Sequence, residues 1–171
     1  MNTYDAIKKR HSARSYNGKQ ITDAALEQIL LSGSMAAVGM GAFDSMLFTV
    51  VQNKELLDEI DFAAGQGKNH PIYGAPTLII LSAKELRLPN IEYSNAGCVL
   101  ENMMIMAADL EIDNIYLWGA AMAVRNNPEL KAKLNIPEEY NPVASLALGY
   151  SDEGRDKVKE EVHKIKVEYF R

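Results

Sequence analysis

SNAGCVLENMMIMAADL, residues 94–110, is the stretch that decides how this chain folds. Alanine, valine, leucine and methionine recur along it at the three- and four-residue spacing of a helix, while Cys98 and Ile105 add apolar character on another side. A helix that is apolar nearly all round is buried, either at the centre of a fold or against a second subunit. We therefore expect 94–110 to be a buried helix in one of these two positions, with Cys98 as a small core residue.

Five other segments have the character of strands. Two short apolar runs, 77–83 (TLIILSA) and 143–150 (VASLALGY), are typical of strands buried on both faces. The β-branched and aromatic residues of 46–53 and 114–119 also favour strands, and 163–170 alternates apolar and polar residues like a half-exposed strand. Helical patterns lie between these segments. The sequence therefore predicts an α+β fold, with a mixed central β-sheet flanked by helices on both faces.

Capping residues mark where helices begin. Asn2 or Thr3 can cap a first short helix, Thr22 a second and Asn53 a third, because their side-chain oxygens accept from free backbone N–H groups. Pro128 suits the first position of a later helix, where its missing N–H is not needed.

Length and composition are those of one globular domain spanning residues 1–171, with 47% hydrophobic and 24% charged residues. The formal net charge of −5 argues against a nucleic-acid partner, because such binding relies on many Lys and Arg residues. The sequence has one cysteine, no signal peptide and no run of about 18 apolar residues. These features predict a cytoplasmic protein with no membrane partner.

Several motif-like stretches do not match the motifs they suggest. GMGAFD (39–44) lacks the third glycine of GxGxxG, and GQGK (65–68) lacks the spacing of a phosphate-binding P-loop, so both are expected to be turns. The three histidines have no metal-ligand spacing, and we expect no metal site. No acid/base pair or GxSxG motif is recognisable, so no catalytic side chain is assigned.

The segment RHSARSYNGKQI (10–21) concentrates positive charge in an acidic chain. Basic residues often end a helix because they oppose its dipole, which accounts for Lys8–Arg10 but not for Ser12 and Arg14. In an extended segment, residues two apart project to the same side, so Arg10, Ser12 and Arg14 can face one ligand. Arginine suits both a phosphate and a ring carbonyl. A ligand that carries both is a nucleotide or a flavin.

RHSARSY is similar to the N-terminal Arg-x-Ser-x-Arg/Lys signature of the nitroreductase family, the FMN-dependent NAD(P)H oxidoreductases. Four more segments resemble family segments in order and approximate spacing: YGAPTLIILSA, NAGCVLENMMIMAADL, NIYLWG and LALGY. The resemblance covers nearly the whole chain and identifies it as a short-chain variant. It implies one FMN-binding, nitroreductase-like domain that forms a homodimer with a shared interface.

The resemblance assigns cofactor contacts to the N-terminal cluster. Arg10 and Ser12 match the residues that hold the FMN phosphate and ribityl chain, and His11 lies between them. Arg14 matches the basic residue near the pyrimidine edge of the flavin. A cation there stabilises the negative charge of the reduced ring and raises its potential.

Two later pairs complete the implied site. Trp118 and Gly119 match the turn after the family's fourth strand, which lies beside flavin N5. Lys164 and Lys166 fall near the C-terminal basic pair that completes the phosphate site, although they equally suit the solvated face of an edge strand.

The sequence also departs from the family pattern. Many members carry an Asn and a Gln-Pro before the second strand, whereas this chain has Ala42 and Asp44-Ser45 there. Glu111 replaces the glycine that is common after the central helix. These changes bear on the contacts near the substrate, and the short chain leaves no room for a large covering insertion.

The implied activity is a hydride transfer from NAD(P)H, through flavin N5, to an electron-poor acceptor such as a nitroaromatic or a quinone. Such chemistry depends on positioning more than on acid/base residues. The lost Asn and Gln-Pro favour an alternative, a flavin-binding protein that stores, delivers or senses FMN. A cofactor-free structural domain on the same fold is a third reading.

Overall fold

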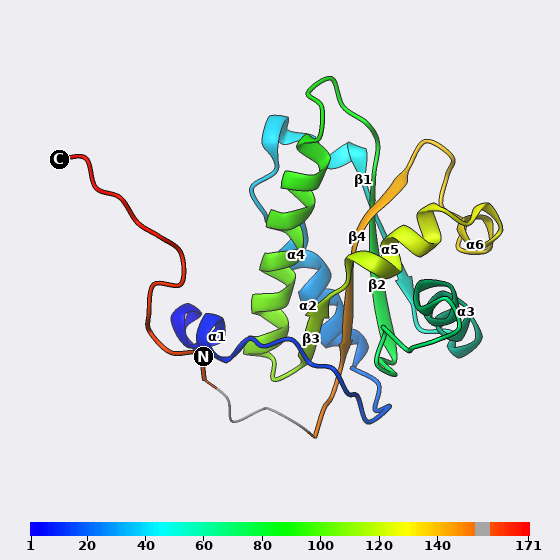
Figure 1. Ribbon diagram of the computed structural model, residues 1–171, viewed down its shortest axis with the longest axis horizontal. Coiled ribbons are helices and arrows are strands. Elements are labelled where there is room, and N and C mark those ends of the chain that lie inside the picture. Colours follow the sequence, from blue (N-terminus) through cyan, green and yellow to red (C-terminus); the bar gives the residue numbers. More distant parts are fainter. Residues whose placement is uncertain (153–157) are drawn as a thin grey trace.

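The computed structural model describes residues 1–152 and 158–171, and its centre is a four-stranded sheet in the order β1-β2-β4-β3 (Figure 1). The three strand pairings are all antiparallel. Within the described residues, parallel pairing is limited to an isolated bridge between Ser12 and Asn114, so the prediction of a mixed sheet was wrong for the strands themselves. The strands are β1 (Met46–Val51), β2 (Thr77–Ala83), β3 (Asp113–Tyr116) and β4 (Asn141–Gly149).

Helices cover both faces of the sheet, which confirms the predicted α+β architecture. Helices α1, α2 and α4 lie on one side, and α3, α5 and α6 on the other (Figure 1). The described helices are α1 (Thr3–Lys9), α2 (Asp23–Ser34), α3 (Lys54–Gly65), α4 (Ile91–Asp109), α5 (Trp118–Arg125) and α6 (Pro128–Lys133). None of these is both long and apolar enough to cross a membrane.

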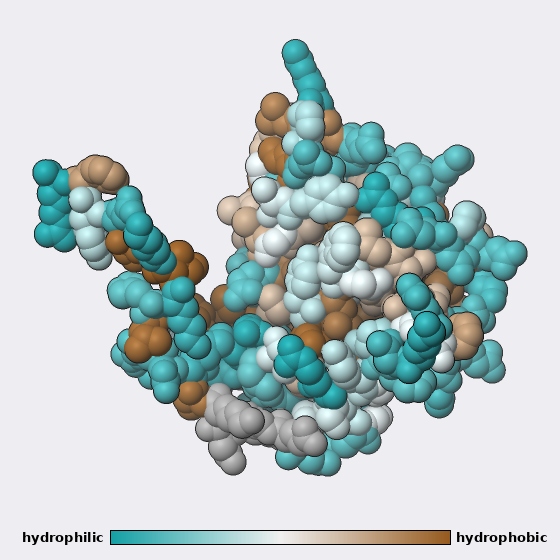
Figure 2. Space-filling model, viewed as in Figure 1, coloured by the Kyte–Doolittle hydropathy of each residue, from teal (hydrophilic) through white to brown (hydrophobic). Residues whose placement is uncertain are grey.

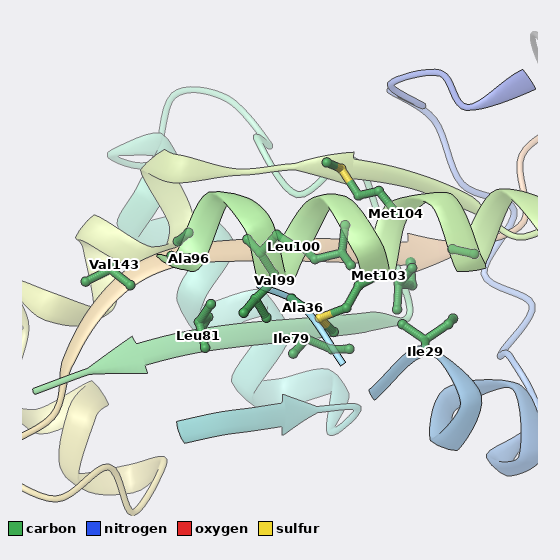
Figure 3. Close-up of a cluster of buried hydrophobic side chains, with 14 of the residues drawn as sticks. Ile29, Ala36, Ile79, Leu81, Ala96, Val99, Leu100, Met103, Met104 and Val143 are labelled. Carbon is green, nitrogen blue, oxygen red and sulfur yellow. The ribbon is translucent and has the colours of Figure 1, made fainter. Parts of the chain in front are cut away.

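Strand β2 divides the core into two clusters because its side chains alternate between the two faces. Ile79 and Leu81 pack with α2 and α4, whereas Leu78 and Ile80 pack with α3, α5 and α6. Figure 3 shows α4 lying over β2, with Val99 and Met103 turned toward the strand and Met104 turned away from it. Of the two positions predicted for this helix, the structure shows the one at the centre of the fold. Cys98, in contrast, is exposed, so its prediction as a core residue was wrong.

The capping residues predicted the starts of these helices correctly. The side chains of Asn2, Thr22 and Asn53 each accept a backbone N–H at the start of a helix, and Pro128 occupies the first turn of α6. The two glycine-containing stretches are turns, as predicted: short 3₁₀ segments occupy 39–45, and a turn follows α3.

Two strand predictions need correction. The strand predicted over 114–119 ends at Tyr116, and Trp118 already begins α5. The strand predicted over 163–170 is absent: this segment is an exposed arm that leaves the body of the molecule beside α1 (Figures 1 and 2). A strand requires a hydrogen-bonding neighbour, and the described part of the chain provides none here. Its apolar side chains, including Ile165 and Phe170, are consequently exposed.

Glu111 occupies a backbone conformation that favours glycine, with φ at +58°. It follows α4 in a Schellman arrangement, in which the Ile112 N–H donates to the Ala107 oxygen (2.8 Å). A left-handed backbone costs a non-glycine residue roughly 1 kcal/mol. We expect Glu111→Gly to raise the free energy of unfolding by about 0.5–1 kcal/mol, measured by urea denaturation at fixed protein concentration. Glu111→Gln is the matched control; equal stabilisation by Gln would show that the charge, not the backbone, is responsible.

Candidate functional site

The N-terminal cluster lies against the outer strand of the sheet. After α1 ends, Ser12 forms its bridge with Asn114, and the Ala13 N–H donates to the Asn114 oxygen (3.1 Å). Strand β3 has β4 on one side and is the outer strand of the sheet, and residues 12–13 pair with its other side at Asn114. Ala13 is buried, whereas Ser12 is half-buried and Arg14 exposed, as expected for an extended segment that alternates between core and solvent.

Arg10 and His11 border a cavity of about 270 Å³ between α1, the end of α4 and the start of β3. Its walls carry both signs of charge. The lining residues are Lys9, Arg10, His11, Ala108, Glu111, Ile112, Asp113 and Asn114. Ser12 and Arg14 are not among them, so the cavity brings together only half of the predicted N-terminal cluster.

The ring of His11 is directed at a buried carboxylate. Its Nε2 lies 3.4 Å from Oδ1 of Asp113, and its Nδ1 lies 3.3 Å from the Lys9 carbonyl oxygen. Oδ2 of Asp113 in turn accepts the Ser151 N–H (2.7 Å). Nε2 of His11 is buried beside this carboxylate but makes no hydrogen bond.

The C-terminal arm returns to the same place and adds a cation that sequence reasoning missed. The Lys159 N–H donates to the Lys8 oxygen (3.0 Å), and its ammonium donates to the Ile7 oxygen (2.8 Å). Lys8 and Glu161 form an ion pair of 2.7 Å that holds the arm to α1. Lys-Val-Lys at 157–159 has the same spacing as Lys-Ile-Lys at 164–166 and could have signalled a second candidate pair.

The charges of Arg10 and Lys164 act on Lys159, and we refer to these three residues as the cation cluster. Partial burial lowers the pKa of Lys159, and the positive charges of Arg10 and Lys164 lower it further, with Glu101 opposing them. Lys166 instead pairs with Glu168 and is largely exposed. The structure therefore joins one residue of the predicted C-terminal pair to Arg10, and replaces the other with Lys159.

Trp118 and Gly119 lie beyond the other end of β3. The Leu117 N–H donates to the Ser145 oxygen of β4 (2.8 Å), and α5 begins at the next residue, Trp118. Trp118 is 57% exposed, and a Cβ built on Gly119 would have no heavy atom within 4 Å. The four residues of β3 span about 14 Å. The two predicted parts of the site thus lie near the two ends of β3 rather than forming a single closed pocket.

The segment that departs from the family pattern uses its polar groups internally. Ser45 donates its hydroxyl to the Ala42 oxygen (2.7 Å), and the Asp44 oxygen accepts from the Tyr140 hydroxyl (3.1 Å). The Gly39 N–H donates to Oδ1 of Asn95 (2.8 Å). None of these contacts presents a side-chain amide in place of the Asn and Gln that many family members carry here.

The three cations of this cluster suit the phosphate of a ligand that lies along the outer strand of the sheet. A phosphate carries up to two negative charges and several acceptor oxygens, which Arg10, Lys159 and Lys164 can share. Among the described residues, no group of His, Cys, Asp and Glu side chains could hold a metal ion. The charges of Arg10, Lys159 and Lys164 fit a ligand that carries a phosphate.

Comparison with known proteins identifies the family of this chain. A protein of Archaeoglobus fulgidus, provisionally named NADH dehydrogenase/NAD(P)H nitroreductase, is 27% identical over 88% of this chain and 86% of its own length. A nitroreductase from Bacteroides fragilis, whose crystal structure has bound FMN, is 28% identical in sequence and superposes with a TM-score of 0.80. The match covers 99% of this chain and 100% of that one. A nitroreductase from Desulfitobacterium hafniense, 24% identical, shares the fold with a TM-score of 0.85 and full coverage of both chains. The model of the nitroreductase family matches residues 7–67 and 61–150, and this chain belongs to that family.

Proposed function

We propose that this protein is an FMN-dependent oxidoreductase that takes hydride from NAD(P)H and passes it to an electron-poor acceptor, such as a nitroaromatic or a quinone. The observation that carries the proposal is that Arg10, which borders the cavity at the start of β3, and Lys159, whose ammonium donates to the Ile7 oxygen of α1, come together from the two ends of the chain. FMN in the Bacteroides fragilis structure and the names of the relatives support the same cofactor and co-substrate.

In this proposal the cation cluster binds the FMN phosphate, and Ser12 binds the ribityl chain. Arg14 lies near the pyrimidine edge of the flavin, and Trp118 and Gly119 lie near N5. When bound, FMN supplies the hydride-accepting and hydride-donating ring. The chain supplies position and charge, because a fixed cation beside the ring favours its reduced, negatively charged form.

We also propose that residues 1–171 act as one domain and that two copies share the site. Met35 is 77% exposed, and it borders an apolar groove between α1, α2 and α4 that includes Ile105 and Met106. The arm carries further exposed apolar residues, among them Ile165 and Phe170. Apolar surface of this extent favours contact with another chain, and a second copy would cover the groove and the arm together.

The test begins with the visible spectrum of the purified protein and identification of the flavin released on denaturation. We expect one FMN per subunit, and bleaching of its absorbance on anaerobic mixing with NADH or NADPH. A nitroaromatic or quinone should then restore the oxidised spectrum. A yellow protein that stays oxidised would support the alternative of flavin storage, delivery or sensing, which the departures at 42–45 favour. A colourless protein that cannot be loaded with FMN would contradict both.

The lowered pKa of Lys159 predicts how FMN binding depends on pH. A bound phosphate favours the charged lysine, so FMN affinity is highest where Lys159 is protonated and falls as the pH rises through its pKa. Because the pKa of Lys159 lies below the ordinary value for lysine, the decrease in FMN affinity should begin at a lower pH than it would with a free lysine. Lys159→Arg keeps its charge and should shift the fall to higher pH. Dissociation constants of FMN and riboflavin between pH 7 and 10.5 would check this; an unchanged profile in the Arg variant would remove Lys159 from the site.

A further inference from the structure

Asp113 is a buried carboxylate at the point where three parts of the candidate site meet. It is the first residue of β3 and is 5% exposed. One oxygen accepts the Ser151 N–H (2.7 Å), and the other lies 3.4 Å from Nε2 of His11. A buried carboxylate is costly unless its environment satisfies its charge, so these contacts are not incidental.

The segments that meet at Asp113 carry the cations of the proposed phosphate site. His11 lies between Arg10 and Ser12, and Ser151 follows β4 just before the chain continues toward Lys159. Backbone contacts reinforce this junction: the Asn17 N–H donates to the Tyr150 oxygen (2.9 Å). Burial, and to a lesser degree the charge of Asp113, raises the pKa of Tyr16 above its usual range, so this segment also faces the carboxylate.

The geometry of His11 shows how Asp113 can act on its neighbours. Nε2 of the ring is buried 3.4 Å from Oδ1 of Asp113 without forming a hydrogen bond, and Nδ1 lies 3.3 Å from the Lys9 carbonyl oxygen. The carboxylate therefore bounds the space in which the ring is held, and the backbone that carries the ring is the link between Arg10 and Ser12. The Lys9 contact also ties the ring to the end of α1, from which Arg10 follows.

We propose that Asp113 is a positioning residue for the flavin phosphate, acting through His11 on Arg10 and Ser12. This inference rests on the proposed function. The proposed effect of Asp113, which is to strengthen phosphate binding, is opposite to the effect of its negative charge alone. A carboxylate beside a phosphate repels it, so removal of the charge should tighten binding if Asp113 did nothing else.

Glu111 offers a matched comparison. It lines the same cavity and carries the same charge, but it is exposed, whereas Asp113 is buried and makes the contacts described above. Asp113→Asn keeps the shape and an oxygen for the Ser151 N–H, but it presents an amide NH₂ to His11 in place of an acceptor. Glu111→Gln removes only a surface charge.

The experiment is a titration of FMN and of riboflavin into flavin-stripped full-length protein, followed by quenching of flavin fluorescence. We expect Asp113→Asn to weaken FMN binding roughly tenfold, the loss of about one charge-assisted contact, and to change riboflavin binding less than about twofold. Glu111→Gln should leave FMN binding equal or tighter. His11→Gln should reproduce the selective loss, and adding Asp113→Asn to it should weaken FMN binding little further.

FMN carries a phosphate and riboflavin does not, so comparing their affinities distinguishes an effect on the phosphate site from a general effect on the fold. Equal loss of FMN and riboflavin affinity in Asp113→Asn would show a merely structural role and overturn the inference. Tighter or unchanged FMN binding in this variant would overturn it too. If Asp113→Asn does not fold, His11→Gln decides: a loss of FMN affinity without loss of riboflavin affinity supports the inference, and any other result overturns it. Wild-type protein that binds neither flavin would instead refute the proposed function, and the inference with it.

Discussion

Arg10→Ala is expected to lower the affinity for FMN by roughly 10- to 100-fold while the protein remains folded. Arg10 is half-buried beside the cavity and belongs to the cation cluster with Lys159 and Lys164. A hydrogen bond to a charged group contributes about 1.5–3 kcal/mol, which corresponds to this loss if the phosphate is not bound otherwise. Flavin retained after gel filtration and the dissociation constant of FMN measure the effect, with circular dichroism as the check on folding.

Arg14→Ala is the matched control because Arg14 comes from the same segment but is exposed and lies outside the cavity. We expect this variant to keep FMN and to lower its reduction potential, since the cation proposed beside the ring is lost. Loss of FMN in Arg14→Ala but not in Arg10→Ala would reverse the proposed assignment of phosphate and ring ends. An unchanged potential with FMN bound would remove Arg14 from the ring site.

Deletion of residues 158–171 is expected to abolish stable FMN retention and to weaken dimerisation in the same preparation. It removes Lys159 and Lys164 from the cation cluster, together with Glu161, which pairs with Lys8. It also removes the exposed apolar residues of the arm, whose area would be covered in a dimer. Sedimentation and flavin content, measured on the same samples, follow both effects.

A shorter deletion, residues 163–171, separates the two roles of the arm. It retains Lys159 and the Lys8–Glu161 ion pair, so FMN binding should weaken less than in the longer deletion, while most of the apolar arm is lost. Equal flavin loss in both would place the critical contacts after residue 162. An unaffected dimer in both would show that the arm is not part of the interface, and a full-length monomer that retains FMN at micromolar concentration would overturn the shared site.

The sequence alone determined those features that depend on neighbours in the chain. The caps at Thr22 and Asn53 are local hydrogen bonds, and the buried strand at 77–83 is visible as an apolar run. The unusual residue at 111 was also evident as a departure from glycine, and its left-handed backbone gives that departure a physical meaning. Short-range physics acts on a few consecutive residues, so a pattern in the sequence can indicate it.

Only the tertiary structure decided which distant segments meet. A strand exists only with a neighbour, so the alternating pattern of 163–170 did not suffice to make one. Cys98 lies on an apolar helix, yet it is exposed because no other element within the described chain covers that side. Lys159 reaches Arg10, and Asp113 reaches His11, across about a hundred residues or more of sequence. No local pattern encodes such contacts, because they depend on the packing of the helices and strands that carry them.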